Sequence, residues 1–539
     1  MNIQFEIPVY YLSLKPDVPC KGFWDYAMIE EIFEHTQTYE VSTLPRKSHA
    51  IIVIPGRSHG DPATVKQLKG ELDKIDKKIL FIMGDEEHVF PIDEFKEKDT
   101  IIYVQNPDIN IDPEYRKLGC GYTPHVTKYA PENIPEKKYD FFFAGQITHE
   151  RRSEMVKYLR NVKKGILVES KSFTKGISQE AYVDQMSQAK IVPCPSGPQI
   201  PDTFRLYEAL ELGCVPIADI KAKNNVYTDY WQWLFDSAIP FPTIQSWEDL
   251  PGYINDSVKR YPALNNIVQA WWFRYKNKLY KKIVDDIKKI SGDIHKEYVT
   301  VVIPISPIPS HPDTAIFQET YESIRYHHPS ADIILTFDGV RPEQQDKYAD
   351  YQEHIRQVLW IVRDDKNVIP YVFDKHLHQV GMMREIIDTI QTPQILYIEH
   401  DCPLVTDYTI EWTSIIDAIE SGKSNLVRFH FEAFIPEPHK SLMLKQDGNL
   451  METAQWSQRP HIASTAFYRR ILRDCFSEHA KCFIEDMMHG IVVNDYLNNG
   501  RPGWQQWRLH IYYPPGVIKR SYTTDGRAGS QKFDTDQIW

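Results

Sequence analysis

The sequence predicts an α/β protein made of two modules, and three observations carry this prediction. Short apolar segments alternate with longer amphipathic ones along the whole chain, the pattern of sheets covered by helices. The chain has 539 residues, which is more than one core accommodates. The polar segment 291–297, SGDIHKE, interrupts the pattern, and a fresh strand follows it. We therefore expect two α/β units joined by this linker.

The first module contains a series of predicted buried strands, the first four of which end in Gly, Asp or Asn turns, where α/β proteins place ligands. The predicted strands cover 49–56, 78–85, 100–106, 139–145, 164–170, 189–195 and 214–219. A long helix with an apolar and a basic face is predicted from Leu264 to Ile290. We expect this helix to pack across the preceding domain, and binding along a membrane surface is the alternative.

The second module repeats the alternation after the linker. Strands are predicted at 298–306, 331–339 and 393–401, with helices near Thr314–His327 and His376–Thr389. A further strand and turn are predicted at 461–470 on the acceptor side, and the polar tail 520–531 is predicted to be a mobile lid or disordered.

Composition excludes several classes of function. A net charge of -12 argues against a broad nucleic-acid-binding surface. No apolar run approaches the roughly 18 residues of a membrane span, so any membrane contact should be peripheral. The seven cysteines are scattered singly and the N-terminus lacks the apolar run of a signal peptide, which predicts a cytoplasmic protein with reduced thiols. The 31 Tyr, 24 Phe and 12 Trp predict either large cores or aromatic platforms for sugar rings.

The stretch DTFRLYEALELGCVPIAD (202–219) predicts a helix that begins at Asp202 and ends at Gly213. Arg205 and Glu208 share one edge of this helix, which follows a Pro/Gly-rich loop. A helix N-terminus favours phosphate, and an arginine adds bidentate contacts to its oxygens. A glutamate one turn later can accept two ribose hydroxyls. The residues therefore suit a nucleotide diphosphate, and a surface ion pair is the alternative.

Residues 189–219 resemble the donor-site signature of the exostosin family of GT-B glycosyltransferases. In that signature a strand and a P-x-G loop precede a Ser/Thr-x-Arg-x-x-Glu-Ala helix, and Gly-Cys-x-Pro-Val follows. The resemblance implies that Thr203, Arg205 and Glu208 bind the donor. The segment 139–160 is similar to the family's strand and glycine turn before an arginine helix. It implies that Gly145, Arg151 and Arg152 lie near the diphosphate.

This resemblance also implies a GT-B fold of two Rossmann-like halves, an acceptor half (1–135) and a donor half (136–290), that works without a metal. An inverting GT-B enzyme needs a general base from the acceptor half. GDEEHVF (84–90) follows a predicted strand, and Asp85 and Glu86 are the first candidates, beside Glu87, His88 and, elsewhere, His59. A solvated loop end is the alternative.

The strand order of residues 298–539 resembles a GT-A glycosyltransferase, a single Rossmann-like nucleotide-sugar-binding domain. Asp338 ends the second strand, where a carboxylate can receive a uracil N–H or a ribose hydroxyl. Glu399 and Asp401 stand where that fold has an Asp-x-Asp motif, whose hard oxygen ligands hold Mn²⁺ or Mg²⁺ against two phosphates. Asp401 is then the direct ligand, and Glu399 departs from the motif. Acidic residues that merely end a strand are the alternative.

The segment CFIEDMMHG (482–490) resembles the Glu-Asp element of inverting GT-A enzymes, in which a carboxylate deprotonates the acceptor hydroxyl. We assign the base to Asp486, with Glu485 as its rival, and an acidic pair at a helix start is the alternative. His510 is a candidate late metal ligand, although a lone histidine is more often structural.

Together these features predict a bifunctional glycosyltransferase that is inverting at both sites. It would transfer two sugars from nucleotide-sugar donors, UDP-sugars above all, to an oligosaccharide or glycolipid acceptor in surface polysaccharide synthesis. One active module beside a glycan-binding or scaffolding domain is the alternative. A nucleotide-sugar-modifying enzyme such as an epimerase is disfavoured, because no GxGxxG fingerprint follows the early strands. The sequence leaves the sugars, the linkages and the oligomeric state open.

Overall fold

The computed structural model describes residues 7–18, 20–170, 176–222, 225–292, 298–430, 435–515 and 522–524. Its internal contacts divide the chain into two compact units, Asn2–Ile294 and His295–Trp539. The division falls within the expected linker 291–297, of which residues 293–297 lie outside the described part. Among the described residues, none of the helices is both long enough and apolar enough to cross a membrane.

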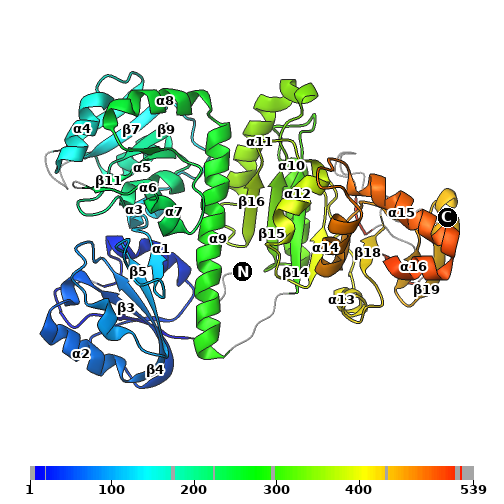
Figure 1. Ribbon diagram of the computed structural model, residues 1–539, viewed down its shortest axis with the longest axis horizontal. Helices are drawn as coiled ribbons and strands as arrows, with labels where there is room; N and C mark the ends of the chain where they lie inside the picture. The colour runs from blue at the N-terminus through cyan, green and yellow to red at the C-terminus, as the bar shows by residue number, and fades with distance from the viewer. Residues whose placement is uncertain are drawn as a thin grey trace. The chain divides into compact units, whose positions relative to one another are not determined.

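The N-terminal unit contains two parallel, Rossmann-like sheets, one in each of its halves (Figure 1). The first sheet has the order β2-β1-β3-β4-β5-β6 and the second has the order β13-β10-β9-β7-β8. The first consists of β1 (Val9–Leu12), β2 (Thr38–Val41), β3 (Lys47–Pro55), β4 (Ile75–Met83), β5 (Thr100–Gln105) and β6 (Arg116–Leu118). The second consists of β7 (Tyr139–Gln146), β8 (Gly165–Ser170), β9 (Ala189–Cys194), β10 (Val215–Asp219) and β13 (Thr243–Ile244), beside a small β11 (Lys221–Ala222) and β12 (Asn225–Val226) pair.

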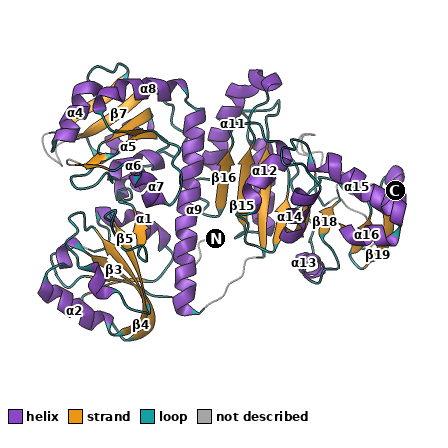
Figure 2. Cartoon of the chain, in the orientation of Figure 1, coloured by secondary structure: helices purple, strands orange, loops and turns teal. Residues whose placement is uncertain are grey.

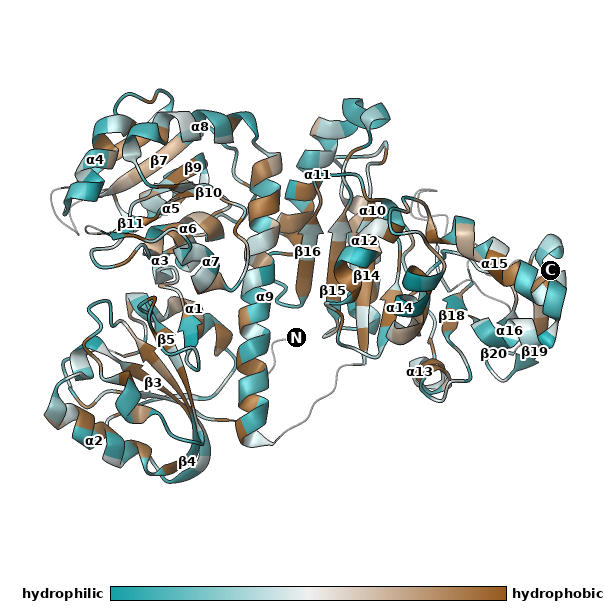
Figure 3. Ribbon diagram, viewed as in Figure 1, coloured by the Kyte–Doolittle hydropathy of each residue, from teal (hydrophilic) through white to brown (hydrophobic). Residues whose placement is uncertain are grey.

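The central strands form where the sequence has continuous apolar runs. In β3 and β4 the residue pairs Ile51–Ile79 and Val53–Phe81 lie in register, and all four side chains are fully buried. A parallel sheet is covered on both faces, so its strands are apolar throughout rather than at alternate positions. Figure 3 shows these strands as hydrophobic bands inside more polar helices.

The helices of this unit cover its two sheets and connect them. They are α1 (Ala27–Ile32), α2 (Pro62–Leu72), α3 (Pro124–Lys128), α4 (Glu150–Leu159), α5 (Gln179–Ser187), α6 (Phe204–Glu211), α7 (Tyr230–Phe235), α8 (Leu250–Lys259) and α9 (Ala263–Ser291). Helix α9 runs along both halves (Figure 1), confirming that the predicted long helix packs across the domain. Its Trp272 donates from Nε1 to Glu211 of α6 at 2.7 Å, and its Asp286 accepts from the Tyr103 hydroxyl of β5 at 2.8 Å.

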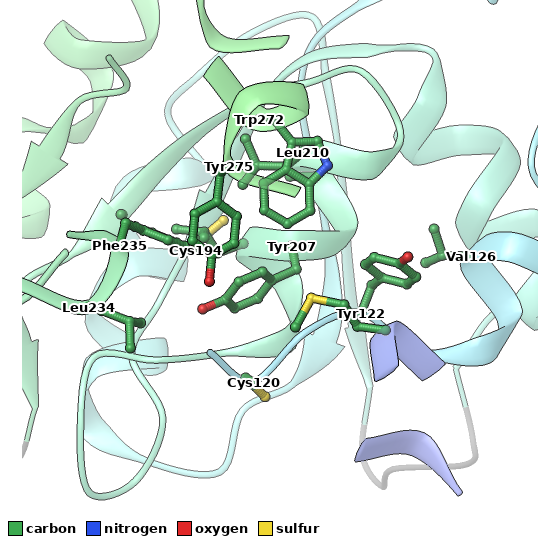
Figure 4. Close-up of a cluster of buried hydrophobic side chains, with 14 of the residues drawn as sticks. Cys120, Tyr122, Val126, Cys194, Tyr207, Leu210, Leu234, Phe235, Trp272 and Tyr275 are labelled. Carbon is green, nitrogen blue, oxygen red and sulfur yellow. The ribbon is translucent and has the colours of Figure 1, made fainter. Parts of the chain in front are cut away.

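Helix α6, which carries the predicted donor motif, is fixed by a buried aromatic cluster (Figure 4). Tyr207 lies between Trp272 and Tyr275 of α9 and the segment that carries Cys120 and Tyr122. A Cβ on Gly119 would lie 1.8 Å from the Tyr207 hydroxyl, so only glycine fits there. The position of α6 is therefore set by contacts with α9 and with the chain that joins the two halves.

The C-terminal unit contains one mixed sheet with the order β16-β15-β14-β17-β21-β18-β22-β20-β19. Figure 2 shows strands of this unit in orange and its helices in purple. Its strands are β14 (Val299–Ile305), β15 (Asp332–Phe337), β16 (Val368–Val372), β17 (Gln394–Tyr397), β18 (Leu426–Phe429), β19 (Met443–Asp447), β20 (Leu450–Thr453), β21 (His461–Ser464) and β22 (Leu509–Tyr512). Its helices are α10 (Ala315–His327), α11 (Tyr348–Ile361), α12 (His378–Ile387), α13 (Trp412–Glu420), α14 (Thr465–Asp474), α15 (Ile484–Asn499) and α16 (Arg501–Trp507).

Strands β14, β15, β16 and β17 are parallel to one another, so their carboxyl ends meet at one edge of the sheet.

The prediction of a strand and turn at 461–470 is wrong in its second half, because β21 runs directly into α14. The α14 sequence is amphipathic and buries Phe467, Tyr468, Ile471 and Leu472.

Candidate functional site

In the C-terminal unit, a potential metal-binding group follows β17 at the edge where the parallel strands end. One ligand atom each of Glu399, Asp401 and Cys402 lies within 4.8 Å of the others. The two carboxylates are the hard oxygen ligands that Mn²⁺ and Mg²⁺ prefer. The sequence did not predict the third member, the Cys402 thiol. The structure thus brings together the two carboxylates that the sequence selected.

His510 is not part of this group, which corrects its prediction as a metal ligand. It lies on β22, and β21 and β18 stand between β22 and β17 in the sheet. Its Nδ1 is 2.9 Å from the Ser424 hydroxyl, and burial lowers its pKa to about 4. The alternative, a structural histidine, fits this position.

Asp338 holds the chain's own backbone rather than presenting a free carboxylate. Its Oδ1 accepts from the N–H groups of Gly339 (2.9 Å) and Leu377 (2.7 Å), and its Oδ2 accepts from His378 N–H at 3.1 Å. The Nδ1 of His376 lies 2.7 Å from the same Oδ2. A carboxylate has about four acceptor positions, and backbone N–H groups take three of them, so the predicted contact with uracil or ribose stays a prediction.

The two candidate bases at the start of α15 differ in their surroundings. Glu485 is partly buried, and its Oε2 accepts from the Gln458 N–H at 3.0 Å. Asp486 is exposed, and its charge acts on the nearby His378. Asp486 is therefore the more exposed of the two carboxylates, and its role as the base stays a prediction.

The sequence did not single out Gln379, which connects the metal group to α15. It donates to Glu399 at 2.7 Å and accepts from the Ile484 N–H at 3.3 Å.

Of the tail at 520–531, only residues 522–524 are described, and there Thr523 forms a β-bridge with Leu404.

In the N-terminal unit, Arg205 and Glu208 are both buried and bind different groups. Arg205 donates from Nη2 to the Ala144 carbonyl at 2.6 Å, and its guanidinium lies 4.4 Å from the centre of the Phe143 ring. The Glu208 carboxylate accepts from the Thr123 hydroxyl at 2.7 Å and the Tyr182 hydroxyl at 2.6 Å. Both side chains are buried, which excludes the surface ion pair. Two of the roughly four acceptor positions of the Glu208 carboxylate are engaged within the chain, and its ribose-binding role stays a prediction.

A second arginine, which is half-buried, lies close to Arg205. Arg152 donates from Nη1 to the Gln146 carbonyl at 3.1 Å, while burial and then the charge of Arg205 lower its pKa to about 10. The Nε atoms of both arginines find no hydrogen-bond partner within the described part of the chain. Gly145 makes room for this pair, since a Cβ there would lie 2.7 Å from Nη2 of Arg205. Two adjacent guanidinium groups, one buried and one half-buried, favour an anion such as a diphosphate.

Arg151 has a structural role, which corrects its prediction as a diphosphate ligand. Its Nε and Nη2 donate to the two oxygens of Asp219 at 3.1 and 2.6 Å, which joins α4 to the end of β10.

Thr203 is the N-cap residue of α6, without a side-chain capping bond, and its contact with the sugar-nucleotide donor stays a prediction. Asp202 is not the cap, because its carboxylate accepts from the Cys120 N–H at 2.8 Å.

Of the candidate bases in the first half, Glu86 is the one whose charge acts on Arg152. Burial raises its pKa, which the charges of Arg57 and Arg152 oppose. Asp85 instead accepts from the N–H groups of Val89 (3.0 Å) and Phe90 (2.9 Å) and so shapes its own loop. The sequence missed Asp25, whose pKa is raised to about 6 by burial and then by Glu86.

The other early candidates are engaged structurally. His59 accepts from the Leu14 N–H at 3.0 Å, Glu87 pairs with Arg57 at 2.8 Å, and His88 contacts the Asn106 carbonyl at 2.8 Å. These contacts leave Glu86, with Asp25 beside it, as the acidic group of this site.

The parallel sheets and the Arg152–Arg205 pair fit an enzyme that binds a sugar nucleotide, and a comparison with protein families gives the class. Residues 122–290 match the RXYLT1 C-terminal domain, a glycosyltransferase-related family. The match identifies the chain as a glycosyltransferase. It includes Gly145, Arg152 and Arg205 and does not extend into the C-terminal unit.

Solved structures show only distant likenesses. S. aureus TarS 1-349 is 11% identical over 42% of this chain and 60% of that chain, with a TM-score of 0.28. GalNAc-T7 with UDP, GalNAc and Mn²⁺ is 9% identical over 41% of this chain and 43% of that chain, with a TM-score of 0.26. Scores this low carry no argument about this chain. A comparison with curated proteins gives no match.

Proposed function

We propose that this glycosyltransferase is bifunctional, with a GT-B-type, exostosin-like site in the N-terminal unit and a GT-A-type site in the C-terminal unit. The observation that supports the proposal is that each unit has its own cluster suited to a sugar-nucleotide donor. One cluster is the Arg152–Arg205 pair near Glu86, and the other is the Glu399–Asp401 group, which Gln379 joins to α15.

At the N-terminal site, Arg152 and Arg205 would bind the donor diphosphate. The Glu86 carboxylate would take the proton of the acceptor hydroxyl, whose oxygen forms a bond to the anomeric carbon of the sugar. The bond between that carbon and the diphosphate oxygen breaks in the same step, and the configuration inverts. The two guanidinium groups stabilise the negative charge of the leaving diphosphate without a metal.

At the C-terminal site, Asp486 would accept the proton of the second acceptor hydroxyl. Glu399 and Asp401 would hold Mn²⁺ or Mg²⁺, which supplies compensation for the charge of the leaving diphosphate. Gln379 orients Glu399, and Asp338 holds the backbone that precedes α12. The acceptor in both reactions is proposed to be an oligosaccharide or glycolipid of a growing surface glycan.

The test uses the full chain, a panel of UDP-sugars and mass detection of transfer or UDP release, with EDTA or with added Mn²⁺. We expect Arg205→Ala and the milder Glu86→Gln to abolish a metal-independent activity, and Asp401→Asn to abolish a metal-dependent one. If either site's variants lose both activities while remaining folded, the two sites are not independent. A unit that turns over no donor is the outcome expected of the alternative, a glycan-binding or scaffolding domain.

A further inference from the structure

In the C-terminal unit, one buried amide joins the two parts of the proposed GT-A site. Gln379 lies in the first turn of α12 and is 6% exposed. Its Nε2 donates to Oε1 of Glu399 at 2.7 Å, and its Oε1 accepts from the Ile484 N–H at 3.3 Å. We infer that Gln379 is a positioning residue that fixes the first turn of α15, which carries Asp486, relative to Glu399.

The chemistry of the two partners leaves the amide a single orientation. A carboxylate such as that of Glu399 only accepts hydrogen bonds, and a backbone N–H such as that of Ile484 only donates. A glutamine side chain offers both groups: its N–H donates to the Glu399 carboxylate, and its carbonyl oxygen accepts from the Ile484 N–H. A methionine of similar length offers no N–H donor, and a glutamate would place a second negative charge against Glu399.

Helix α15 depends on this contact because its start has no local cap. The N-cap residue is Phe483, which makes no side-chain capping bond. The first N–H groups of a helix have no partner within it and need acceptors from elsewhere. Gln379 supplies such an acceptor from another helix, 105 residues away in sequence.

Gln379 is itself held rigidly by the residues that precede it. The N–H groups of Leu377 and His378 bind Asp338 at the end of β15, and His378 has a φ of 60°. A histidine in the left-handed region is strained and persists only where its surroundings hold it. The Phe483 ring also contacts the His378 ring edge-on at 4.4 Å. The end of β15, the start of α12 and the start of α15 are therefore fastened to one another.

This inference rests on the proposed GT-A function, in which Glu399 belongs to the metal side and Asp486 is the base. Loss of Gln379 would leave Glu399 and the Ile484 N–H each without this partner. The base would then be misplaced relative to the donor, and a displacement of about 1 Å costs on the order of 10²-fold in rate. Donor binding should change little, because in the part of the chain that the structure describes Gln379 hydrogen-bonds to one proposed metal ligand, Glu399, whose carboxylate is kept.

The experiment compares Gln379→Met with Gln391→Met in the full chain. Gln391 is an exposed residue shortly after the end of α12, so it receives the same substitution outside the site. In Mn²⁺-dependent turnover we expect Gln379→Met to lower kcat about 10²-fold with KM changed by less than about threefold, and Gln391→Met to behave as wild type. A Gln379→Met enzyme with unchanged kcat, or with its whole loss in KM, overturns the inference.

Hydrogen exchange separates failure of this inference from failure of the proposed function. If the wild type shows no metal-dependent turnover, the function fails, yet the coupling can still be measured. We expect the amides at the start of α15 to exchange at least tenfold faster in Gln379→Met than in Gln391→Met. Equal exchange in the two variants overturns the positional role whatever the activity.

Discussion

Gly145→Ala is the most direct perturbation of the N-terminal site. Gly145 lies on β7 and is not among the residues with positive φ, so alanine suits its backbone. The added Cβ would lie 2.7 Å from Nη2 of Arg205, where contacts under 3.0 Å essentially never occur. The substitution therefore acts on the Arg205 guanidinium and not on the strand.

The size of the effect follows from these distances. To reach an ordinary contact of 3.4 Å, Nη2 must retreat by 3.4 − 2.7 = 0.7 Å. A movement of that size along its 2.6 Å hydrogen bond to the Ala144 carbonyl would lengthen the bond beyond the normal range. Displacing a charged donor from its position is worth about 1.5–3 kcal/mol, or roughly 10- to 150-fold in affinity.

The assay is calorimetric titration of UDP into the full chain in EDTA. EDTA removes the divalent metal and so prevents metal-dependent binding of UDP at the C-terminal site. We expect UDP to bind Gly145→Ala at least about tenfold more weakly than the wild type. The matched control is Gly70→Ala on α2, where nothing lies within 4 Å of the added Cβ. Thermal unfolding of both variants checks that the fold is kept.

Wild-type UDP affinity in a folded Gly145→Ala protein would refute the reasoning. It would mean either that Arg205 does not bind the diphosphate or that its position does not matter. Weaker binding in Gly70→Ala as well would show that the effect is not specific to the arginine site.

Two predictions concern stability. Arg151→Met should lower the free energy of unfolding by about 3–5 kcal/mol, because Asp219 is fully buried and loses its partner, while UDP affinity stays within twofold. Urea unfolding and the same titration measure both quantities, and a large loss of UDP affinity would contradict the structural role. Burial raises the pKa of Asp202 from 3.8 to about 7, so its stabilising contribution is complete below about pH 4 and is lost as the pH rises through 7. The stability of the wild type relative to Asp202→Asn should therefore fall between pH 5 and pH 8 in urea unfolding, and a constant difference would contradict the assignment.

Local pattern was enough to predict most of the fold. Continuous apolar runs predicted β3, β4, β5, β7, β9 and β10 because a buried parallel strand is apolar on both faces. Local pattern did not predict short elements such as β1, whose four residues lie between β2 and β3 in the first sheet. It also failed for α14, where a helix follows a strand without the turn that the sequence was taken to indicate.

The sequence by itself determined which residue types gather at each site: a glycine and arginines in one unit, and carboxylates after an apolar strand in the other. Only the tertiary structure decided which of these side chains are available. Arg151 and Arg152 are neighbours, yet Asp219, 68 residues away, engages only the first. Glu208 and Asp338 likewise accept hydrogen bonds from distant Tyr182 and Leu377. Sequence spacing cannot foresee such partners, because a buried charge binds whichever donor or acceptor the fold brings to it.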